Sequence, residues 1–163
     1  MNKLPLGLVA LTLVLSSFFS SASPKSAPDF EIPASSNQPA TSLVELSKQG
    51  WVYLDFWASW CTPCRYSFPF MNQLQTEFGN KGLTVVAINV DAERSKADNF
   101  LRDTPANFTI VYDPEGNIAS AYQVPGMPTS YLIKDGEIVG QHLGFKTSQS
   151  AELKQQISQL LNN

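Results

Sequence analysis

Cys61 and Cys64 are the only cysteines of this chain, and they stand three residues apart. Thiols at this spacing can form a structural disulfide, bind a metal ion or exchange a disulfide with another molecule. A structural role is disfavoured, because closing a four-residue ring is worth only about 2 kcal/mol in the loop-entropy model. A zinc site is short of ligands, since a tetrahedral site takes four and the chain adds only His142. Disulfide exchange is the favoured chemistry.

Disulfide exchange requires one thiol to ionise near neutral pH, although a free thiol titrates near pH ~8.5. A helix is predicted to begin at Thr62, so Cys61 stands where unpaired backbone N–H groups and the helix dipole favour an anion. Pro63 suits the first helical turn, and Thr62 and Pro63 are expected to tune the thiolate. We expect Cys61 to attack a substrate disulfide and the more buried Cys64 to resolve the mixed disulfide.

Asp55 is the unusual residue of the apolar run 51–58. Such a run is typical of a parallel strand covered on both faces, where an isolated carboxylate costs several kcal/mol or stays protonated. Two interpretations stay open. Asp55 is either an aspartate at a partly wet strand end, or a carboxyl of raised pKa that relays a proton for Cys64.

The elements that position these residues follow from apolar patterns and turn signals. A hairpin is predicted around Asp135-Gly136, and a turn at Asp113-Pro114-Glu115-Gly116. The predicted strands are 27–33, 51–58, 83–90, 108–112, 129–134 and 137–143. The predicted helices are 62–78, 93–102 and a short piece at 118–122, followed by a last helix. Pro69 is expected to kink the first of these helices, and Ser148 or Ser150 to cap the last one. This order predicts an α/β fold with a central mixed β-sheet, helices on both faces and right-handed crossovers.

Residues 1–22 have the layout of a secretory signal, with Lys3, an apolar run and small residues before a cleavage site after Ala22. An uncleaved anchor is the competing interpretation, but the apolar run is shorter than the ~20 residues that span a bilayer comfortably. In both cases the rest of the chain lies outside the cytoplasm. Residues 23–26 are a predicted linker, and residues 27–163 have the size of one domain.

The charge distribution argues against one class of partner. The formal net charge is −3, and the Lys and Arg residues are scattered rather than clustered. Nothing in this pattern suggests nucleic-acid binding. We expect a membrane contact only if the N-terminal segment stays uncleaved.

The segment Asp55–Cys64 resembles the active-site segment of the thioredoxin superfamily. Pro69 resembles its helix kink, and 122–136 resembles its stretch around a cis-proline. The resemblance spans residues 27–163. Within the superfamily, the extracytoplasmic branch typified by TlpA and ResA fits best, because 27–30 is similar to its opening strand. The long stretch from Cys61 to Pro128 also leaves room for the helix and strand that this branch inserts.

This resemblance implies a thioredoxin-like fold and a periplasmic thiol:disulfide oxidoreductase without a bound cofactor or metal. Its substrates would be the thiols and disulfides of other proteins, including apocytochrome cysteines, and a membrane electron donor would make it a reductant. The resemblance favours Asp55 as a proton relay and Trp60 as part of the docking surface. It also implies a cis Met127–Pro128 bond opposite Cys61, which exposes the Met127 backbone to a substrate peptide.

Two residues depart from the superfamily pattern, and the sequence disfavours two other functions. Ala87 stands where thioredoxins carry a lysine near the buried aspartate, and Pro125 stands where they often carry a basic residue. A peroxiredoxin-like peroxidase is disfavoured, because that family's threonine before the reactive cysteine has no match in 58–60. A copper-delivery module is disfavoured by its ligands, since two thiols and one distant histidine do not resemble known copper chaperones.

Overall fold

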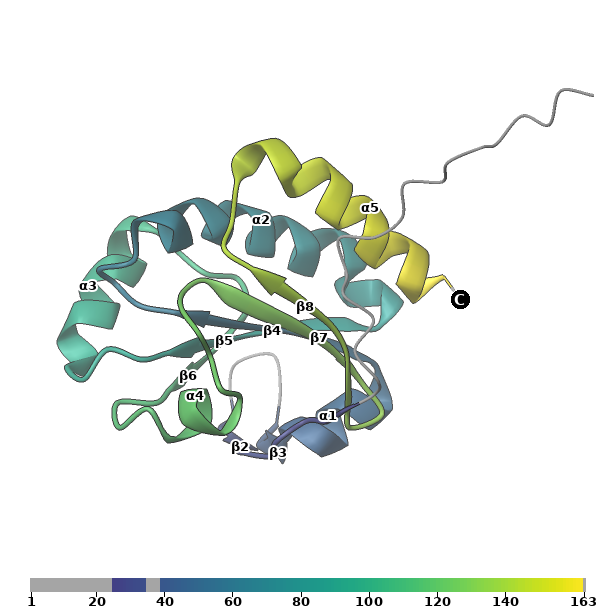
Figure 1. Cartoon of the computed structure of the whole chain (residues 1–163), viewed down its shortest axis with the longest axis horizontal. Helices are drawn as coiled ribbons and strands as arrows, with labels where there is room; N and C mark the ends of the chain where they lie inside the picture. The colour runs from purple at the N-terminus through teal and green to yellow at the C-terminus, as the bar shows by residue number, and fades with distance from the viewer. Residues whose placement is uncertain (1–24, 35–38, 163) are drawn as a thin grey trace, which may run out of the picture.

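A six-stranded sheet in the order β1-β8-β7-β4-β5-β6 forms the centre of the computed structural model, which describes residues 25–34 and 39–162 (Figure 1). The pairs β4·β5 and β5·β6 are parallel, and the other pairs are antiparallel, so the sheet is mixed as expected. Its strands are β1 (Lys25–Ser26), β4 (Trp51–Trp57), β5 (Leu83–Asn89), β6 (Thr109–Tyr112), β7 (Thr129–Lys134) and β8 (Glu137–Leu143).

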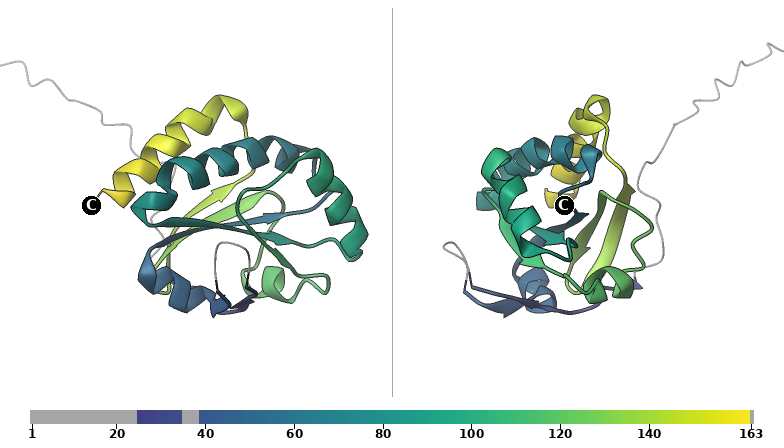
Figure 2. Two further views of the ribbon diagram at one scale, coloured as in Figure 1. Left: turned by 180° about the vertical axis from the view of Figure 1, so that it is seen from behind. Right: turned by 90° about the vertical axis from the view of Figure 1, so that its left-hand side faces the viewer.

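Helices cover both faces of this sheet (Figure 2). One face carries α2 (Thr62–Phe78), α3 (Arg94–Asp103) and α5 (Ser150–Leu161), and the opposite face carries α1 (Leu43–Gln49) and α4 (Asn117–Ala121). A separate two-stranded sheet of β2 (Glu31–Ile32) and β3 (Thr41–Ser42) lies on the α1 side, and the short 3-10 turns are η1 (Gly79–Lys81) and η2 (Thr147–Gln149).

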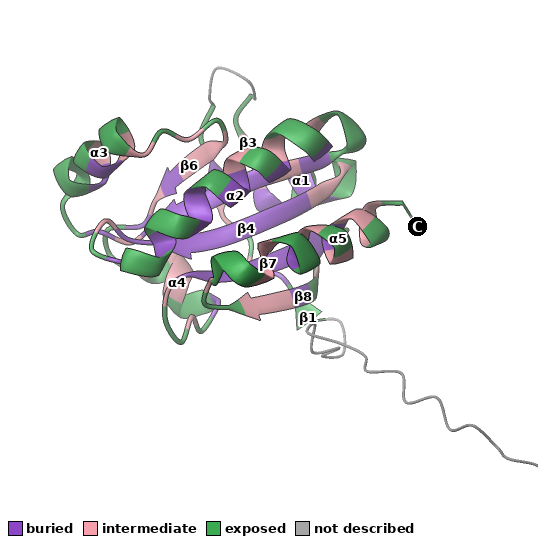
Figure 3. Ribbon diagram, turned by 90° about the horizontal axis from the view of Figure 1, so that it is seen from above, coloured by how far each residue is buried: buried purple, intermediate pink, exposed green. Residues whose placement is uncertain are grey.

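The side chains of the central strand β4 alternate between the two faces of the sheet, because successive side chains of a strand point to opposite faces. Tyr53 and Trp57 pack in the cluster that contains the buried residues of α2, whereas Leu54 and Phe56 pack in the cluster that contains α1. All residues of β4 after the first are buried (Figure 3). Asp55 lies between Tyr53 and Trp57 in the sequence, so its side chain belongs to the α2 face.

The main elements confirm the sequence predictions. Helix α2 and both strands of the β7–β8 hairpin have the predicted bounds, and α3 with β6 occupies the stretch where an inserted helix and strand were expected. Helix α2 continues through Pro69. Helix α2 begins at Thr62 as the sequence pattern predicted, and residues 58–61 connect it to the end of β4.

Three details of the prediction were wrong. Helix α1 was missed, although Ser42 accepts a hydrogen bond from the Glu45 N–H, which is half of the Ser-x-x-Glu capping pattern at its start. The strand predicted over 27–33 is limited to β2, which pairs with β3 outside the main sheet. The last helix has Gln149 at its N-cap without a side-chain cap, because the Ser150 hydroxyl donates to the Thr147 carbonyl instead.

The N-terminal predictions fall mostly outside the described residues. The signal segment 1–22 and the first half of the linker 23–26 lie there. The second half of that linker is β1, in which Lys25 pairs with Ile138 and Ser26 with Glu137 of β8. Within the described ranges, no helix is long and apolar enough to cross a membrane.

Two glycines make a close backbone contact where β4 and β5 begin. The Trp51 N–H donates to the Gly82 carbonyl at 2.7 Å, and a Cβ atom on Gly50 would lie well within van der Waals contact of that same oxygen. Gly82 itself has a φ of +87°, a conformation that favours glycine. The junction therefore has no room for a side chain at position 50.

Gly50→Ala is expected to destabilise the protein by about 1–3 kcal/mol, the usual cost of overpacking a site that cannot yield. Urea unfolding measures the loss. Gly126→Ala is the matched control, because a Cβ atom there would meet no atom within 4 Å. Equal stabilities for Gly50→Ala and the wild type would contradict the close contact.

Candidate active site

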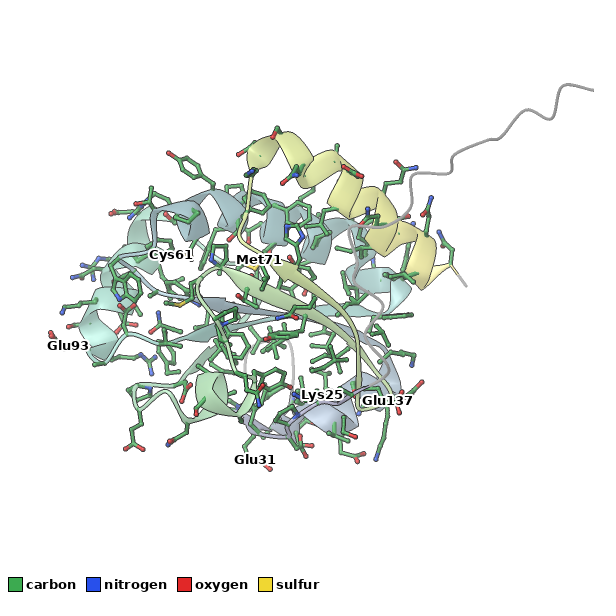
Figure 4. The ribbon with its side chains drawn as sticks, viewed as in Figure 1. Lys25, Glu31, Cys61, Met71, Glu93 and Glu137 are labelled. Atoms are coloured by element: carbon green, nitrogen blue, oxygen red, sulfur yellow. A yellow bond between two sulfur atoms is a disulfide. The ribbon has the colours of Figure 1, made fainter. Side chains whose placement is uncertain are left out.

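Cys61 and Cys64 form a disulfide at the start of α2, at the end of the helix that lies beside α3 (Figure 4). Cys61 is the N-cap residue of α2, and its Sγ accepts a hydrogen bond from the Cys64 N–H at 3.2 Å. Cys61 is 5% exposed and Cys64 is fully buried, while Thr62 and Pro63 between them are exposed. The predicted positions of the two cysteines at the helix start are confirmed.

The surroundings of Cys61 favour a negative charge on its sulfur once the disulfide is reduced. An N-cap sulfur lies at the positive end of a 17-residue helix. The first turn of α2 contains no acidic residue, and Pro63 occupies a position where its missing N–H costs nothing. Arg65 lies over the Phe100 ring at 4.6 Å and donates to the Thr104 hydroxyl, which links α2 to the inserted helix α3.

A buried carboxylate holds the turn that precedes Cys61, and sequence analysis missed it. The backbone N–H and the hydroxyl of Ser59 both donate to Asp91, each at 2.9 Å. The Asn89 amide donates to the same carboxylate at 2.8 Å, and the Cys61 N–H donates to the Ala58 carbonyl. An Asn-x-Asp sequence at the carboxyl end of a buried strand, next to the strand that leads to the cysteines, is the signal that points to this contact.

Two tryptophans near the disulfide have different surroundings. Trp60 is 67% exposed, beside the disulfide, and Tyr66 on the outer side of α2 is also exposed. Trp57 is fully buried, with its ring 4.8 Å from the Phe68 ring and 4.9 Å from the Phe100 ring. Trp60 therefore offers an apolar surface to a partner, whereas Trp57 is a core residue.

The Met127–Pro128 peptide bond is cis, as the sequence predicted. Thr129 pairs with Phe56, so β7 begins next to the end of β4 from which the chain leads to the cysteines. The Thr129 hydroxyl donates to the Gly126 carbonyl at 2.6 Å. A hollow of about 260 Å³ borders this loop and is lined by Pro125, Gly126, Met127, Pro128, Thr129, Leu143 and Gly144.

Asp55 lies in the middle of the sheet rather than at a wet strand end. Its side chain is 1% exposed, and its Oδ2 atom has no hydrogen-bond partner within the described part of the chain. Its in-register neighbours are Ala87 on β5 and Ser130 on β7, neither of which is charged. Burial without a compensating cation raises the pKa of the Asp55 carboxyl well above its usual value. The site thus holds a buried carboxyl that keeps its proton to higher pH than an ordinary aspartate does.

This raised pKa predicts how stability depends on pH. Between the unfolded and folded pKa values of Asp55, the folded protein keeps a proton that the unfolded chain has released, so stability falls as pH rises through that window. We expect oxidised Asp55→Asn to be more stable than the oxidised wild type at about pH 7 and to lose this advantage near pH ~4, where the unfolded aspartate also binds a proton.

Urea unfolding of both oxidised proteins over this pH range measures the difference. A gap between the two stabilities that stays constant with pH would contradict the raised pKa.

Comparisons with known proteins agree with the chemistry of this site. A family model described as the AhpC/TSA family matches residues 24–142. The chain is 36% identical over 115 residues to the thiol-disulfide oxidoreductase ResA of Oceanobacillus iheyensis, an alignment that covers 69% of this chain and 60% of the relative. It is 33% identical over 129 residues to ResA of Bacillus cereus, with 78% of this chain and 73% of the relative covered.

A solved structure supports the same relationship. The crystal structure of a Chlorobium tepidum protein named for the thiol:disulfide interchange protein DsbE matches with a TM-score of 0.78 and 45% sequence identity. The match covers 87% of this chain and 99% of the other. The agreement therefore includes almost the whole of that protein.

Proposed function

This chain belongs to the AhpC/TSA family and is a thiol-disulfide oxidoreductase of thioredoxin-like fold, and we propose that it acts as a reductant of protein disulfides in the periplasm. The observation that carries the proposal is the placement of Cys61 and Cys64 at the start of α2, on the sheet face to which Asp55 also belongs. A dithiol needs both an ionised nucleophile and a group that takes the second proton, and Cys61 and Asp55 are proposed for these two roles.

The reaction begins from the dithiol form. The Cys61 thiolate attacks one sulfur of a substrate disulfide, and the other substrate sulfur leaves as a thiolate. The Cys64 thiol then gives its proton to the Asp55 carboxylate and attacks Cys61 Sγ, which releases the second substrate thiolate. The substrate gains two electrons, and the protein ends with the Cys61–Cys64 disulfide. A membrane electron donor is required to restore the dithiol.

Substrate docking is assigned to the exposed surface around the disulfide. Trp60 supplies an apolar contact, and the backbone of Met127 before Pro128 is available for strand-like pairing with an extended peptide. Thr62 and Pro63, which are exposed between the cysteines, tune the thiolate. Client proteins that expose a disulfide in an extended segment, including the cysteine pairs of apocytochromes, have the chemistry that this surface fits.

The division of labour between the cysteines is tested by trapping. Cys64→Ser keeps the nucleophile but cannot resolve, so it is expected to accumulate mixed disulfides with periplasmic proteins, whereas Cys61→Ser should form none. Non-reducing gels after acid quenching measure the adducts. Adducts on Cys61→Ser but not on Cys64→Ser would reverse the assignment.

The direction of electron flow is tested by the reduction potential. Three features favour a reductant: the similarity to ResA, the buried acid Asp55, and the Thr-Pro dipeptide, which is closer to the Gly-Pro of thioredoxin than to the Pro-His of strong oxidants. We expect a potential below about −200 mV, on the thioredoxin side of the known range. A redox titration against glutathione measures it, with turnover on hydrogen peroxide assayed in parallel. A potential near about −120 mV, as in DsbA, would make the protein an oxidant, and peroxide turnover would make it a peroxidase.

A further inference from the structure

Three polar side chains form a row across the sheet, beginning at Asp55. Asp55 on β4 pairs directly with Ser130 on β7, and Ser130 pairs directly with His142 on β8. Directly paired residues on adjacent antiparallel strands place their side chains on one face, with Cβ atoms about 4.5–5.5 Å apart. The row therefore runs from the centre of the sheet to the strand β8.

Independent contacts fix the face on which this row lies. The Tyr53 hydroxyl, on the α2 face with Asp55, donates to Ser130 Oγ at 2.8 Å. His142 lines a shallow hollow together with Gln149, Glu152, Leu153 and Gln156 of the α5 region. Asp55 and Ser130 are buried and His142 is half-buried, so the row leads from the interior to the surface beside α5.

In the oxidised form, among the described residues, the side chain of Ser130 is hydrogen-bonded to Tyr53 and not to Asp55 or His142. Asp55 Oδ2 is buried and has no hydrogen-bond partner within residues 25–34 and 39–162. Ser130 Oγ accepts from Tyr53, which leaves the serine one further lone pair and its own hydrogen. A neutral histidine offers one ring nitrogen as an acceptor. Proton transfer along the row therefore requires the Ser130 hydroxyl to turn toward Asp55 and His142, its in-register neighbours on β4 and β8.

We propose that Ser130 and His142 form a proton path that connects the buried Asp55 carboxyl to solvent beside α5. The proposal rests on the proposed function, in which Asp55 exchanges a proton with Cys64. The proton passes from Asp55 to Ser130 Oγ as the serine hydrogen moves to the imidazole, and the imidazole releases a proton to water. The reverse order returns a proton from water to Asp55. No electron moves in these steps.

The path is needed only when Asp55 changes its protonation state between turnovers. Below the pKa of Asp55, the oxidised protein keeps the proton that Cys64 gave up and returns it to Cys64 at the next reduction. Above that pKa the oxidised protein has lost the proton to solvent. Reduction then leaves a Cys64 thiolate in the interior until a proton arrives from water, so the path matters at alkaline pH.

The titratable groups around the row are few. They are Tyr53 on β4, the two cysteines on α2 and Glu152 on α5, while β5 contributes Ala87 opposite Asp55. Burial raises the pKa of Tyr53 and lowers that of His142, so near neutral pH the phenol keeps its proton and the imidazole is uncharged. Glu152 and His142 line the same shallow hollow at the solvent end of the row.

The path is tested by the rate at which dithiothreitol reduces the oxidised protein, followed by stopped-flow tryptophan fluorescence over about pH 5–9, a range that brackets the groups involved. Dithiothreitol attacks Cys61 Sγ, the Cys61–Cys64 bond breaks, and Cys64 takes up a proton; the second thiol of the reagent then releases Cys61 and leaves the cyclic disulfide. The dependence on dithiothreitol ionisation cancels in the ratio of variant to wild-type rates.

Ser130→Ala and His142→Ala are each expected to give a ratio near one at acidic pH. At alkaline pH the ratio should fall by about tenfold, less than the ~10²-fold expected for Asp55→Asn, because water partly replaces a missing relay group. Free imidazole should restore His142→Ala, and Ser130→Thr should keep the wild-type profile because it keeps the hydroxyl. Gln141→Ala is the control, since Gln141 is the neighbour of His142 and faces the opposite side, where it donates to the Tyr131 hydroxyl.

A ratio near one at every pH, or a slowing that is the same at every pH and is not restored by imidazole, would overturn the path. Slowing in Asp55→Asn without slowing in the Ser130 and His142 variants would overturn the path and leave the proposed function standing. An unchanged reduction rate in Asp55→Asn would instead show that Asp55 is not the proton acceptor. The role of Cys61 in disulfide exchange would still be tested by the accumulation of mixed disulfides in the cysteine variants.

Discussion

An uncompensated carboxyl inside the central sheet is the constraint on which the rest of this structure depends. Asp55 is surrounded by Tyr53, Trp57, Ala87 and Ser130, and its Oδ2 atom has no partner among the described residues. Desolvation of an ionised carboxylate costs several kcal/mol, so this position raises the pKa of the group and reduces the stability of the fold near neutral pH. An apolar residue would cost less at this position, and the proton-transfer role that we propose for Asp55 would account for the acid.

The other features of the site position the two cysteines at the start of α2. Helix α2 places Cys61 at its positive end and keeps Cys64 buried, so the two thiols differ in environment although only two residues separate them. Asp91 holds the preceding turn through Ser59, and Arg65 joins α2 to the inserted helix α3. Asp91 thus fixes the loop, while Asp55 Oδ2 has no hydrogen-bond partner in the part of the chain that the structure describes.

Sequence patterns were sufficient to predict the elements that carry strong local signals. The apolar run of β4, Pro63 in the first turn of α2 and Asp135-Gly136 in the hairpin carry strong local signals, and the corresponding elements lie where they were predicted. Helix α1 is short and was missed despite its Ser42 cap. The Ser59–Asp91 contact and the alignment of Asp55, Ser130 and His142 depend on the register between strands distant in sequence, which no local pattern determines.

The most direct measurement of the central claim is a carbon-13 NMR titration of the Asp55 carboxyl carbon in the oxidised protein, with Asp55→Asn used to assign the signal. The structure predicts a single titration well above the ordinary aspartate value of about 3.9, since burial is its main cause and no cation compensates it. A titration at the ordinary value would show that the carboxyl is hydrated or paired in solution, and would contradict both its role as the proton acceptor and the path through Ser130 and His142.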